Sequence, residues 1–292
     1  MEPWIHPPGG GEALTDRPER WVTARLEHEL MDITESRYSP GVRGPDPHIH
    51  RQHADAFYVL DGELVFGLGP EGATRVRGTT GTFALVPAGV IHTFGNESDA
   101  DARFLNIHAP GMGFIESLRA RRDGRHEDAD RFDQWDPPEN GGRSIDDAVV
   151  RGPGEGETAA LGTTHALYKA GRDDGDSTLA VAEATTAPGF AGMAPHLHER
   201  HVDALFVLEG TYALRVGDEH FELVRGSFAA MLPGQIHASA NPGSEEARVL
   251  SMLAPAGLEQ YLREVAASTP PGEPPDPEKM AAIATRYDVV PQ

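Results

Sequence analysis

One histidine-rich motif occurs twice in this chain. Residues 48–55 read HIHRQHAD, and residues 196–203 read HLHERHVD. A lone histidine follows each copy in matching context, His92 and then His237. Because only 14 of the 292 residues are histidines, four matched positions are hard to obtain by accident. The chain is therefore predicted to contain two copies of one domain.

The hydrophobic pattern favours short strands. Strand-forming runs stand on both sides of the pair Asp61-Gly62, and this pattern predicts a β-hairpin. Similar runs recur at spacings of about 8–12 residues in both halves, which is typical of an antiparallel barrel or sandwich. Helical patterns follow the strands only at 114–122, 258–267 and 277–287.

These patterns predict an all-β protein of two tandem barrels with short helices after each. Residues 1 to about 13 are rich in Pro and Gly and are expected to be irregular. Between the barrels, Phe132 and Trp135 are unusual for a free linker and predict an ordered crossing. The expected parts are a first barrel at 14–122, a linker at 123–160, a second barrel at 161–268 and a tail at 269–292.

Composition excludes several classes of function. The formal charge of −21 disfavours nucleic acids and anionic membranes as partners. No apolar run is long enough for a membrane helix, and the first residues lack the pattern of a signal peptide, so a cytoplasmic protein is expected. The absence of cysteine excludes disulfides and thiolate ligands. Any metal must therefore be held by nitrogen and oxygen atoms.

The repeated motif predicts metal ligands. Residues i and i+2 of a strand face the same side, so His48 and His50 can direct two imidazoles to one point. Asp55 and His92 would add a carboxylate and a third imidazole. Such a set suits Fe, Mn, Ni, Co, Cu or Zn with one position open. One ion per barrel is expected, and the second set is His196, His198, Asp203 and His237.

These residues resemble the cupin family. Residues 44–62 are similar to the first cupin motif, and residues 81–96 are similar to the second. The second half matches in the same way, apart from Pro233, which stands one place late. The resemblance implies two jelly-roll barrels, or double-stranded β-helices, and is weakly specific for the reaction. The family usually has Glu where Asp55 and Asp203 stand, so each aspartate either binds the ion or orients a histidine.

Other polar residues near the motifs are candidates for the site. Glu35 and its counterpart Glu183 precede the metal motifs, and Glu35 is a candidate base, with a solvent-facing strand residue as the alternative. Arg37 would bind an anionic or carbonyl oxygen of the substrate, or pair with Glu35. His53 and His201 are expected to be exposed loop residues.

The first barrel is the predicted site of function because its residues are more varied than those of the second. Alternation from Asp55 places Phe57 inside. Asn106 and His108 correspond to Ser251 and Leu253, so the first half has the richer set of aromatic and polar groups around its ion. The predicted lining consists of Arg37, Phe57, Phe94, Phe104, Asn106 and His108.

By resemblance, the leading hypothesis is a metal-dependent dioxygenase similar to quercetinase-type proteins with two cupin barrels. Its substrate would be a small aromatic or enol-like molecule, with Asp55 as a ligand or as the acceptor of the substrate proton. The alternatives are a non-redox isomerase or decarboxylase, and a binding or storage protein with a structural ion. Both faces of residues 57–60 and 205–208 are apolar, so their outer face must also be covered, by intrachain packing or by a homodimer.

Overall fold

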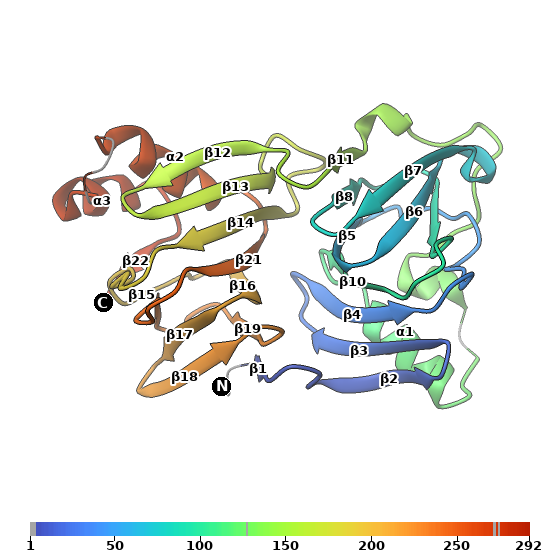
Figure 1. Ribbon diagram of the computed structural model, residues 1–292. Helices are drawn as coiled ribbons and strands as arrows, with labels where there is room; N and C mark the ends of the chain where they lie inside the picture. The colour runs from blue at the N-terminus through green and yellow to red at the C-terminus, as the bar shows by residue number, and fades with distance from the viewer. Residues whose placement is uncertain (1–3, 127, 271–272, 274) are drawn as a thin grey trace. The chain divides into compact units, whose positions relative to one another are not determined.

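The computed structural model describes residues 4–126, 128–270, 273 and 275–292. It divides the chain into two compact units, each built around one barrel (Figure 1). The N-terminal unit contains residues 11–155 and 173–178, and the C-terminal unit contains residues 4–10, 156–172 and the described residues from 179 onward. In both units, antiparallel strands form two facing sheets, which is the predicted all-β jelly-roll architecture.

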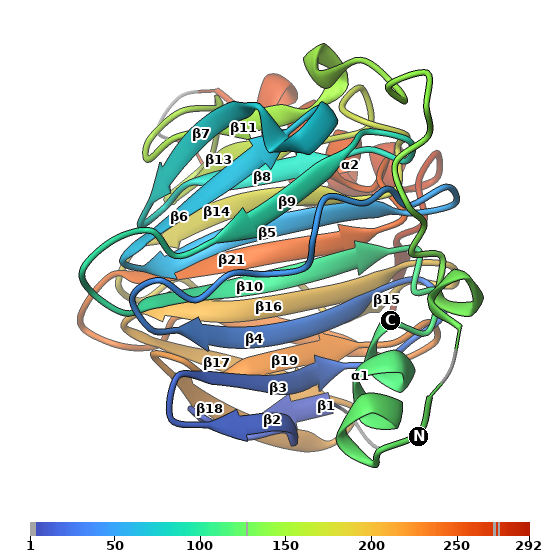
Figure 2. The same ribbon diagram turned by 90° about the vertical axis from the view of Figure 1, so that its right-hand side faces the viewer.

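Most strands of the N-terminal unit lie in a sheet of order β11-β8-β5-β10-β4-β3-β2, and β7-β6-β9 form the facing sheet. Figure 2 shows the strands of the larger sheet side by side. The elements are β2 (Glu12–Arg17), β3 (Arg20–Leu26), β4 (Asp32–Tyr38), β5 (Ala54–Asp61), β6 (Glu63–Leu68), β7 (Thr74–Thr79), β8 (Phe83–Val86), β9 (His92–Gly95), β10 (Ala102–Ala109), α1 (Phe114–Arg122) and β11 (Val149–Arg151).

The C-terminal unit repeats this arrangement with the sheets β1-β19-β16-β21-β14-β13-β12 and β18-β17-β20-β15-β22. Its elements are β1 (Trp4–His6), β12 (Glu157–Leu161), β13 (Thr164–Ala170), β14 (Ala180–Thr186), β15 (His196–Leu197), β16 (Val202–Glu209), β17 (Thr211–Val216), β18 (Glu219–Val224), β19 (Phe228–Met231), β20 (His237–Ala240), β21 (Ala247–Ala254), α2 (Glu259–Ser268), α3 (Pro277–Ala284) and β22 (Val290–Pro291).

The turn at Asp61-Gly62 does not close a hairpin, so that prediction was wrong. β5 pairs with β8 and β10, whereas β6 pairs with β7 and β9, and the turn carries the chain from one sheet to the other. Gly62 has a φ of 76°, and a Cβ there would lie 2.3 Å from the carbonyl oxygen of Asp101. The turn therefore needs glycine, but its local sequence does not specify the strands' partners.

The first residues are also more regular than expected. Residues 4–6 form β1, which pairs with β19, and residues 12–17 form β2, which pairs with β3. In the N-terminal unit, β11 occupies the position next to β8 that β1 occupies next to β19. A three-residue strand thus completes the larger sheet in both barrels. The Pro- and Gly-rich composition of the first residues did not indicate β1, because this strand has only three residues.

The core of the N-terminal barrel is aromatic. Phe57, Phe66, Phe104 and Tyr38 are buried together with aliphatic residues between the two sheets. Each such side chain contributes about 1.5–3 kcal/mol of burial free energy. The C-terminal core contains mainly aliphatic residues, among them Leu205, Val207 and Leu214. The core of the first barrel is therefore the richer of the two in aromatic rings that contact one another.

Helix α1 begins next to the buried side chain of Asp32. One carboxylate oxygen of Asp32 accepts a hydrogen bond from the His28 N–H at 3.3 Å, and the other is buried without a partner in the described structure. Burial raises the pKa of Asp32 from 3.8 to about 6. The folded state therefore binds this proton more tightly than the unfolded state, and the associated stability is lost as pH rises from about 4 through 6.

We expect the Asp32→Asn variant to be more stable than the wild type at pH 7, by about 1–3 kcal/mol. The amide keeps one acceptor oxygen for the His28 N–H and carries no charge. The difference should shrink as the pH falls and vanish only below about pH 3, where Asp32 is protonated in both states. Urea unfolding at the two pH values measures this, and equal stability at pH 7 would rule out a buried charge at Asp32.

Two candidate metal centres

The backbone of the N-terminal barrel brings the ligand histidines together. His48 and His92 exchange backbone hydrogen bonds of 3.1 and 3.0 Å. His50 follows two residues after His48, and its ring centroid lies 5.2 Å from that of His92. The possible ligand atoms of these histidines and of Asp55 all lie within 4.8 Å of one another, and all four residues are buried. The spacing of the sequence motif therefore produces one compact cluster.

Backbone carbonyls fix the orientation of each ring. The Nδ1 atoms of His48, His50 and His92 lie 2.9, 2.8 and 3.0 Å from the carbonyl oxygens of Asp46, Asp133 and Val90. A carbonyl can only accept, so each Nδ1 carries the proton and each Nε2 presents a lone pair to the cluster. The Nε2 atom of His50 is buried without a hydrogen-bond partner in the described structure. This donor set fits a divalent ion.

Burial keeps the imidazoles in the form that binds metal. Desolvation, together with the neighbouring His92 and His50, lowers the pKa of His48 to about 3. The carboxylate of Asp55 lies 3.3 Å from Nε2 of His92 and 3.8 Å from Nε2 of His50. Burial alone would raise the pKa of Asp55, but His108, His50 and His92 hold it well below its usual value. At neutral pH the cluster therefore offers the neutral imidazole of His48 and the charged carboxylate of Asp55.

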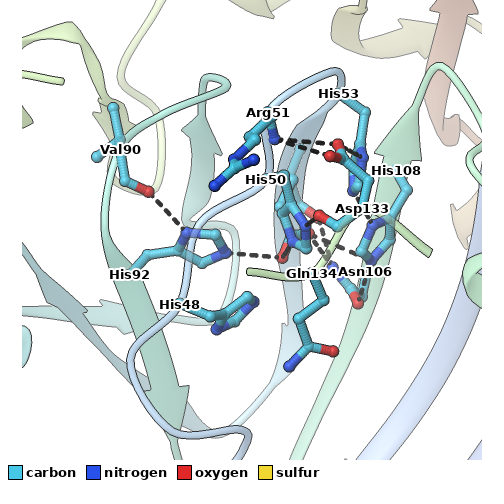
Figure 3. A network of polar contacts seen from close by, with 12 residues as sticks. His48, His50, Arg51, His53, Val90, His92, Asn106, His108, Asp133 and Gln134 are labelled. Carbon is cyan, nitrogen blue, oxygen red and sulfur yellow. Dashed lines mark hydrogen bonds and ion pairs between the residues drawn. The ribbon is translucent and has the colours of Figure 1, made fainter. Parts of the chain in front are cut away.

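Asp133, from the segment after α1, holds the loop between His50 and Asp55 (Figure 3). Its backbone carbonyl orients His50, and its carboxylate accepts the backbone N–H groups of Arg51 and Gln52 at 3.0 and 2.7 Å. The same carboxylate contacts Nδ1 of His53 at 2.9 Å and the indole N–H of Trp135 at 3.0 Å. The linker segment is therefore part of the metal centre.

His53 is not exposed, contrary to the prediction. It is 1% exposed and joins a chain of polar contacts in which its Nε2 lies 2.8 Å from Nδ1 of His108. Nε2 of His108 lies 3.1 Å from the amide oxygen of Asn106, whose nitrogen donates to Asp55. The contacts connect Asp133 to Asp55 through three side chains (Figure 3). The motif looked like a turn because its anchor, Asp133, lies 80 residues away in sequence.

The C-terminal barrel repeats the three-histidine set. The ligand atoms of His196, His198 and His237 lie within 4.8 Å of one another, and this buried group does not include Asp203. The carboxylate of Asp203 lies 3.6 Å from Nε2 of His237, with 22% of its side chain exposed. Burial alone would lower the pKa of His237, but the hydrogen bond and charge of Asp203 raise it. The two centres therefore differ in how closely their carboxylate joins the imidazoles.

The turn between α3 and β22 supplies a second copy of the loop anchor. The carbonyl of Asp288 lies 2.5 Å from Nδ1 of His198. The carboxylate of Asp288 accepts the N–H groups of Glu199 and Arg200 and contacts Nδ1 of His201 at 2.5 Å. With 11% of its side chain exposed, His201 is also not the exposed residue that was expected. Asp133 and Asp288 thus perform the same task in different barrels.

A cavity of about 540 Å³ in the N-terminal unit reaches the first cluster. His48, His50 and Asp55 lie in its wall, and it extends between the β2–β3 hairpin and α1. Helix α1 contacts β2 and β4, as the ribbon in Figure 2 illustrates. The other lining residues are Ala13, Leu14, Thr15, Asp16, Arg17, Arg20, Val22, Thr34, Ser36, Tyr38, Gly44, Pro45, Phe94, Phe104, Asn106, His108, Phe114, Leu118, Arg121, Arg122 and Gln134.

Of the residues predicted to line the substrate pocket, Phe94, Phe104, Asn106 and His108 lie in the wall of this cavity. Phe57 is buried in the core, and its ring centroid lies 4.7 Å from that of Phe94. The alternation from Asp55 therefore predicted correctly that Phe57 faces the interior of the barrel. It did not show that Phe57 would pack in the core without lining the cavity.

Glu35 and Arg37 lie on the opposite face of β4 from the cavity residues Thr34, Ser36 and Tyr38. Glu35 is 1% exposed and pairs with the side chains of Arg25 and Arg103, the latter at 2.6 Å. Arg37 contacts Asp101 at 2.9 Å. The structure therefore gives Glu35 a buried ion cluster instead of a place beside the metal ligands, and Arg37 a surface ion pair.

Three residues of the centre escaped the sequence analysis. Asp133 and Asp288 lie in segments that contain no repeat of the histidine motif, although each follows a barrel and its helix. Thr34 lines the cavity, and its hydroxyl oxygen is buried without a partner in the described structure. The alternation along β4 could have identified Thr34, since it has the same parity as Ser36 and Tyr38.

The fold and the site together define a protein with two barrels, each carrying a buried three-histidine cluster. The model of the cupin domain family (Cupin_2) matches residues 34–108 and 182–253, which is half of the chain. The chain therefore belongs to the cupin family. No curated protein sequence matches it significantly. No helix in the described ranges has the length and apolar character needed to cross a membrane.

Solved structures with two cupin barrels are similar to the whole chain. A glyoxylate-induced protein from Pseudomonas aeruginosa is 16% identical with a TM-score of 0.61, covering 85% of this chain and 87% of its own. The oxalate decarboxylase of Lactobacillus farciminis is 11% identical, with a TM-score of 0.59 and coverages of 98% and 94%. The 7S globulin of Momordica charantia is 16% identical, with a TM-score of 0.57 and coverages of 88% and 85%. At these identities the likeness concerns the fold.

Proposed function

We propose that this protein is a metal-dependent dioxygenase that acts on a small aromatic or enol-like molecule in its N-terminal barrel. The observation that carries the proposal is the cavity of about 540 Å³ whose wall contains both the metal ligands and an aromatic surface. Volumes of this size hold drug-sized organic ligands. The rings of Tyr38, Phe94 and Phe104 contact one another with centroids 5.1–5.9 Å apart. They offer an apolar aromatic wall to a planar substrate.

Different residues of the first barrel would hold the ion, accept a proton and orient the substrate. His48, His50 and His92 would hold the ion through Nε2, with Asp55 as a fourth ligand or beside it. When bound, a first-row ion supplies Lewis acidity to a substrate oxygen and, if it is redox-active, a means of activating dioxygen. Asp55, held by the amide of Asn106, either binds the ion or accepts the proton of a substrate hydroxyl. The aromatic wall orients the ring and excludes water.

A second candidate is a metal-dependent decarboxylase or isomerase that consumes no oxygen. It is supported by the oxalate decarboxylase structures, which share the two-barrel fold over nearly the whole chain. A storage role, as in the 7S globulin, is less favoured, because the first cluster lines a cavity large enough for a substrate. The two enzymatic candidates use the same ligands and differ in the need for oxygen.

The test is oxygen uptake by protein that has been freed of metal and reloaded with Fe, Mn, Ni, Co, Cu or Zn. With flavonols, catechols and β-diketones as substrates, we expect uptake of one O₂ per substrate consumed with at least one redox-active metal and none with Zn. Conversion without oxygen uptake would favour the second candidate. If no metal supports conversion of any compound in this panel, the proposal has failed.

A further inference from the structure

Arginines surround the opening of the cavity. Arg17 and Arg20 are paired residues at the closed end of the β2–β3 hairpin, and Arg121 and Arg122 belong to the last turn of α1. All four line the cavity, and they are exposed or half-buried, whereas the metal ligands at its other end are buried. A molecule that enters the cavity therefore passes these guanidinium groups before it reaches the ion.

The surroundings leave positive charge at this opening. Arg122 is neutralised by Glu12 and Asp123, at 2.8 and 2.9 Å. In contrast, Arg20 lies over the ring of Tyr38 at 5.7 Å, and Arg121 contacts the amide oxygen of Gln134 at 3.3 Å. Neither of these partners carries a charge. Asp16 is the one carboxylate near the opening in the described lining, against Arg17, Arg20 and Arg121.

The positive charge of these arginines is opposite in sign to the net charge of the chain. A net charge of −21 repels anions over long range, so a local group of arginines is what would admit one. The second barrel does not repeat the feature, because the β12–β13 hairpin is closed by the uncharged pair Leu161 and Thr164. The arginines therefore distinguish the barrel that contains the cavity from its copy.

The interior of the cavity suits a planar molecule with an oxygen function. Tyr38 and Phe104 form part of one wall, and Phe114 stacks on His108 with centroids 3.8 Å apart. The hydroxyl of Thr34 is buried in the lining without a partner in the described structure, so a polar group of a ligand would satisfy it. The lining therefore combines exposed or half-buried arginines, aromatic rings and buried metal ligands.

From this combination we infer that the substrate class is a hydroxylated aromatic carboxylate, with its carboxylate at Arg20 and Arg121 and its hydroxyl toward the metal cluster. The inference rests on the proposed function and narrows its substrate. Guanidinium groups bind carboxylates through charge-assisted hydrogen bonds, which are stronger than neutral ones. An acid should therefore bind better than a neutral molecule of the same shape.

The test compares acids with their primary amides in calorimetric titrations of Zn-loaded protein. The probes are 4-hydroxycinnamate and 4-hydroxybenzoate, each against its amide. We expect at least one acid to bind about tenfold more tightly than its amide. Raising NaCl from about 0.05 to 0.5 M should weaken binding of that acid and leave its amide unchanged, because salt screens exposed charges. Equal affinities within both pairs, or no binding by either acid, would overturn the inference.

Two arginine variants test whether Arg20 and Arg121 cause the preference for the acid. Arg20→Gln and Arg121→Gln should each lower the affinity for that acid about three- to tenfold without changing the affinity for its amide. Arg77→Gln is the matched control, since Arg77 is exposed and pairs with Glu63 on β6, away from the opening. An equal loss in all three variants would contradict a specific carboxylate site. The salt dependence of the wild type provides an answer even if a variant fails to fold.

Failure of this inference can be told apart from failure of the proposed function. Oxygen uptake with neutral flavonols, together with equal affinity for acids and amides, would keep the dioxygenase and overturn the acid as substrate. Selective binding of acids, with no conversion by any metal-loaded form, would keep the carboxylate site and overturn the reaction.

Discussion

The His50→Ala variant is expected to bind one divalent ion per chain, where the wild type binds two, and to lose all turnover above background. His50 supplies an unpartnered buried Nε2 to the first cluster, so its removal leaves only two imidazoles there. The His198→Ala variant should also bind a single ion, but it should retain turnover because the cavity described above belongs to the first barrel. Elemental analysis and a turnover assay measure the two effects.

The exposed His220 on β18 provides a control for these variants. His220→Ala should leave both ions and turnover unchanged. If His198→Ala abolishes turnover while His50→Ala does not, the second barrel is the catalytic one. If both variants abolish it, the barrels act together, and the assignment of function to the first barrel is wrong.

The second large effect is expected at Asp133, which contacts no ion in this account. Replacing it by alanine removes the acceptor for the N–H groups of Arg51, Gln52 and Trp135 and the partner of His53. Groups that orient metal ligands typically contribute 10- to 100-fold to metal affinity. We therefore expect Asp133→Ala to weaken metal binding in the first barrel by about that factor. Competition with a chelator measures it.

Asp288→Ala is the matched variant, because Asp288 holds the equivalent loop of the second barrel. It should weaken metal binding in the second barrel and leave metal binding in the first barrel unchanged. Circular dichroism of both variants separates a local change in the loop from loss of the fold. Wild-type affinity for both ions in a folded Asp133→Ala protein would show that the anchor does not position His50.

The duplication made much of the fold predictable from the sequence. The two histidine motifs and the alternating strands indicate two barrels, and α1 spans the residues that its pattern predicts. The meeting of His48, His50 and His92 follows from their spacing on extended segments. Local patterns were sufficient because these features depend on residues close in sequence or repeated at matching places.

The remainder depends on partners distant in sequence. Nothing around Glu35 shows that Arg25 and Arg103 will enclose it. Likewise, the sequence around His53 is typical of a loop, and its contact with Asp133 of the linker cannot be seen in it. Short strands such as β1 exist because a sheet edge is available, so propensity alone does not find them. These contacts belong to the tertiary structure and decide what each side chain can do.

The central claim is that each barrel holds one divalent ion through the Nε2 atoms of three histidines. The most direct measurement is an anomalous-scattering map from crystals of protein loaded with Mn, Fe or Zn. We expect two peaks per chain, each about 2.0–2.2 Å from the three Nε2 atoms of its barrel. A cluster without a peak, or an ion bound through Nδ1 after the rings have turned, would show that the ligand set is wrong.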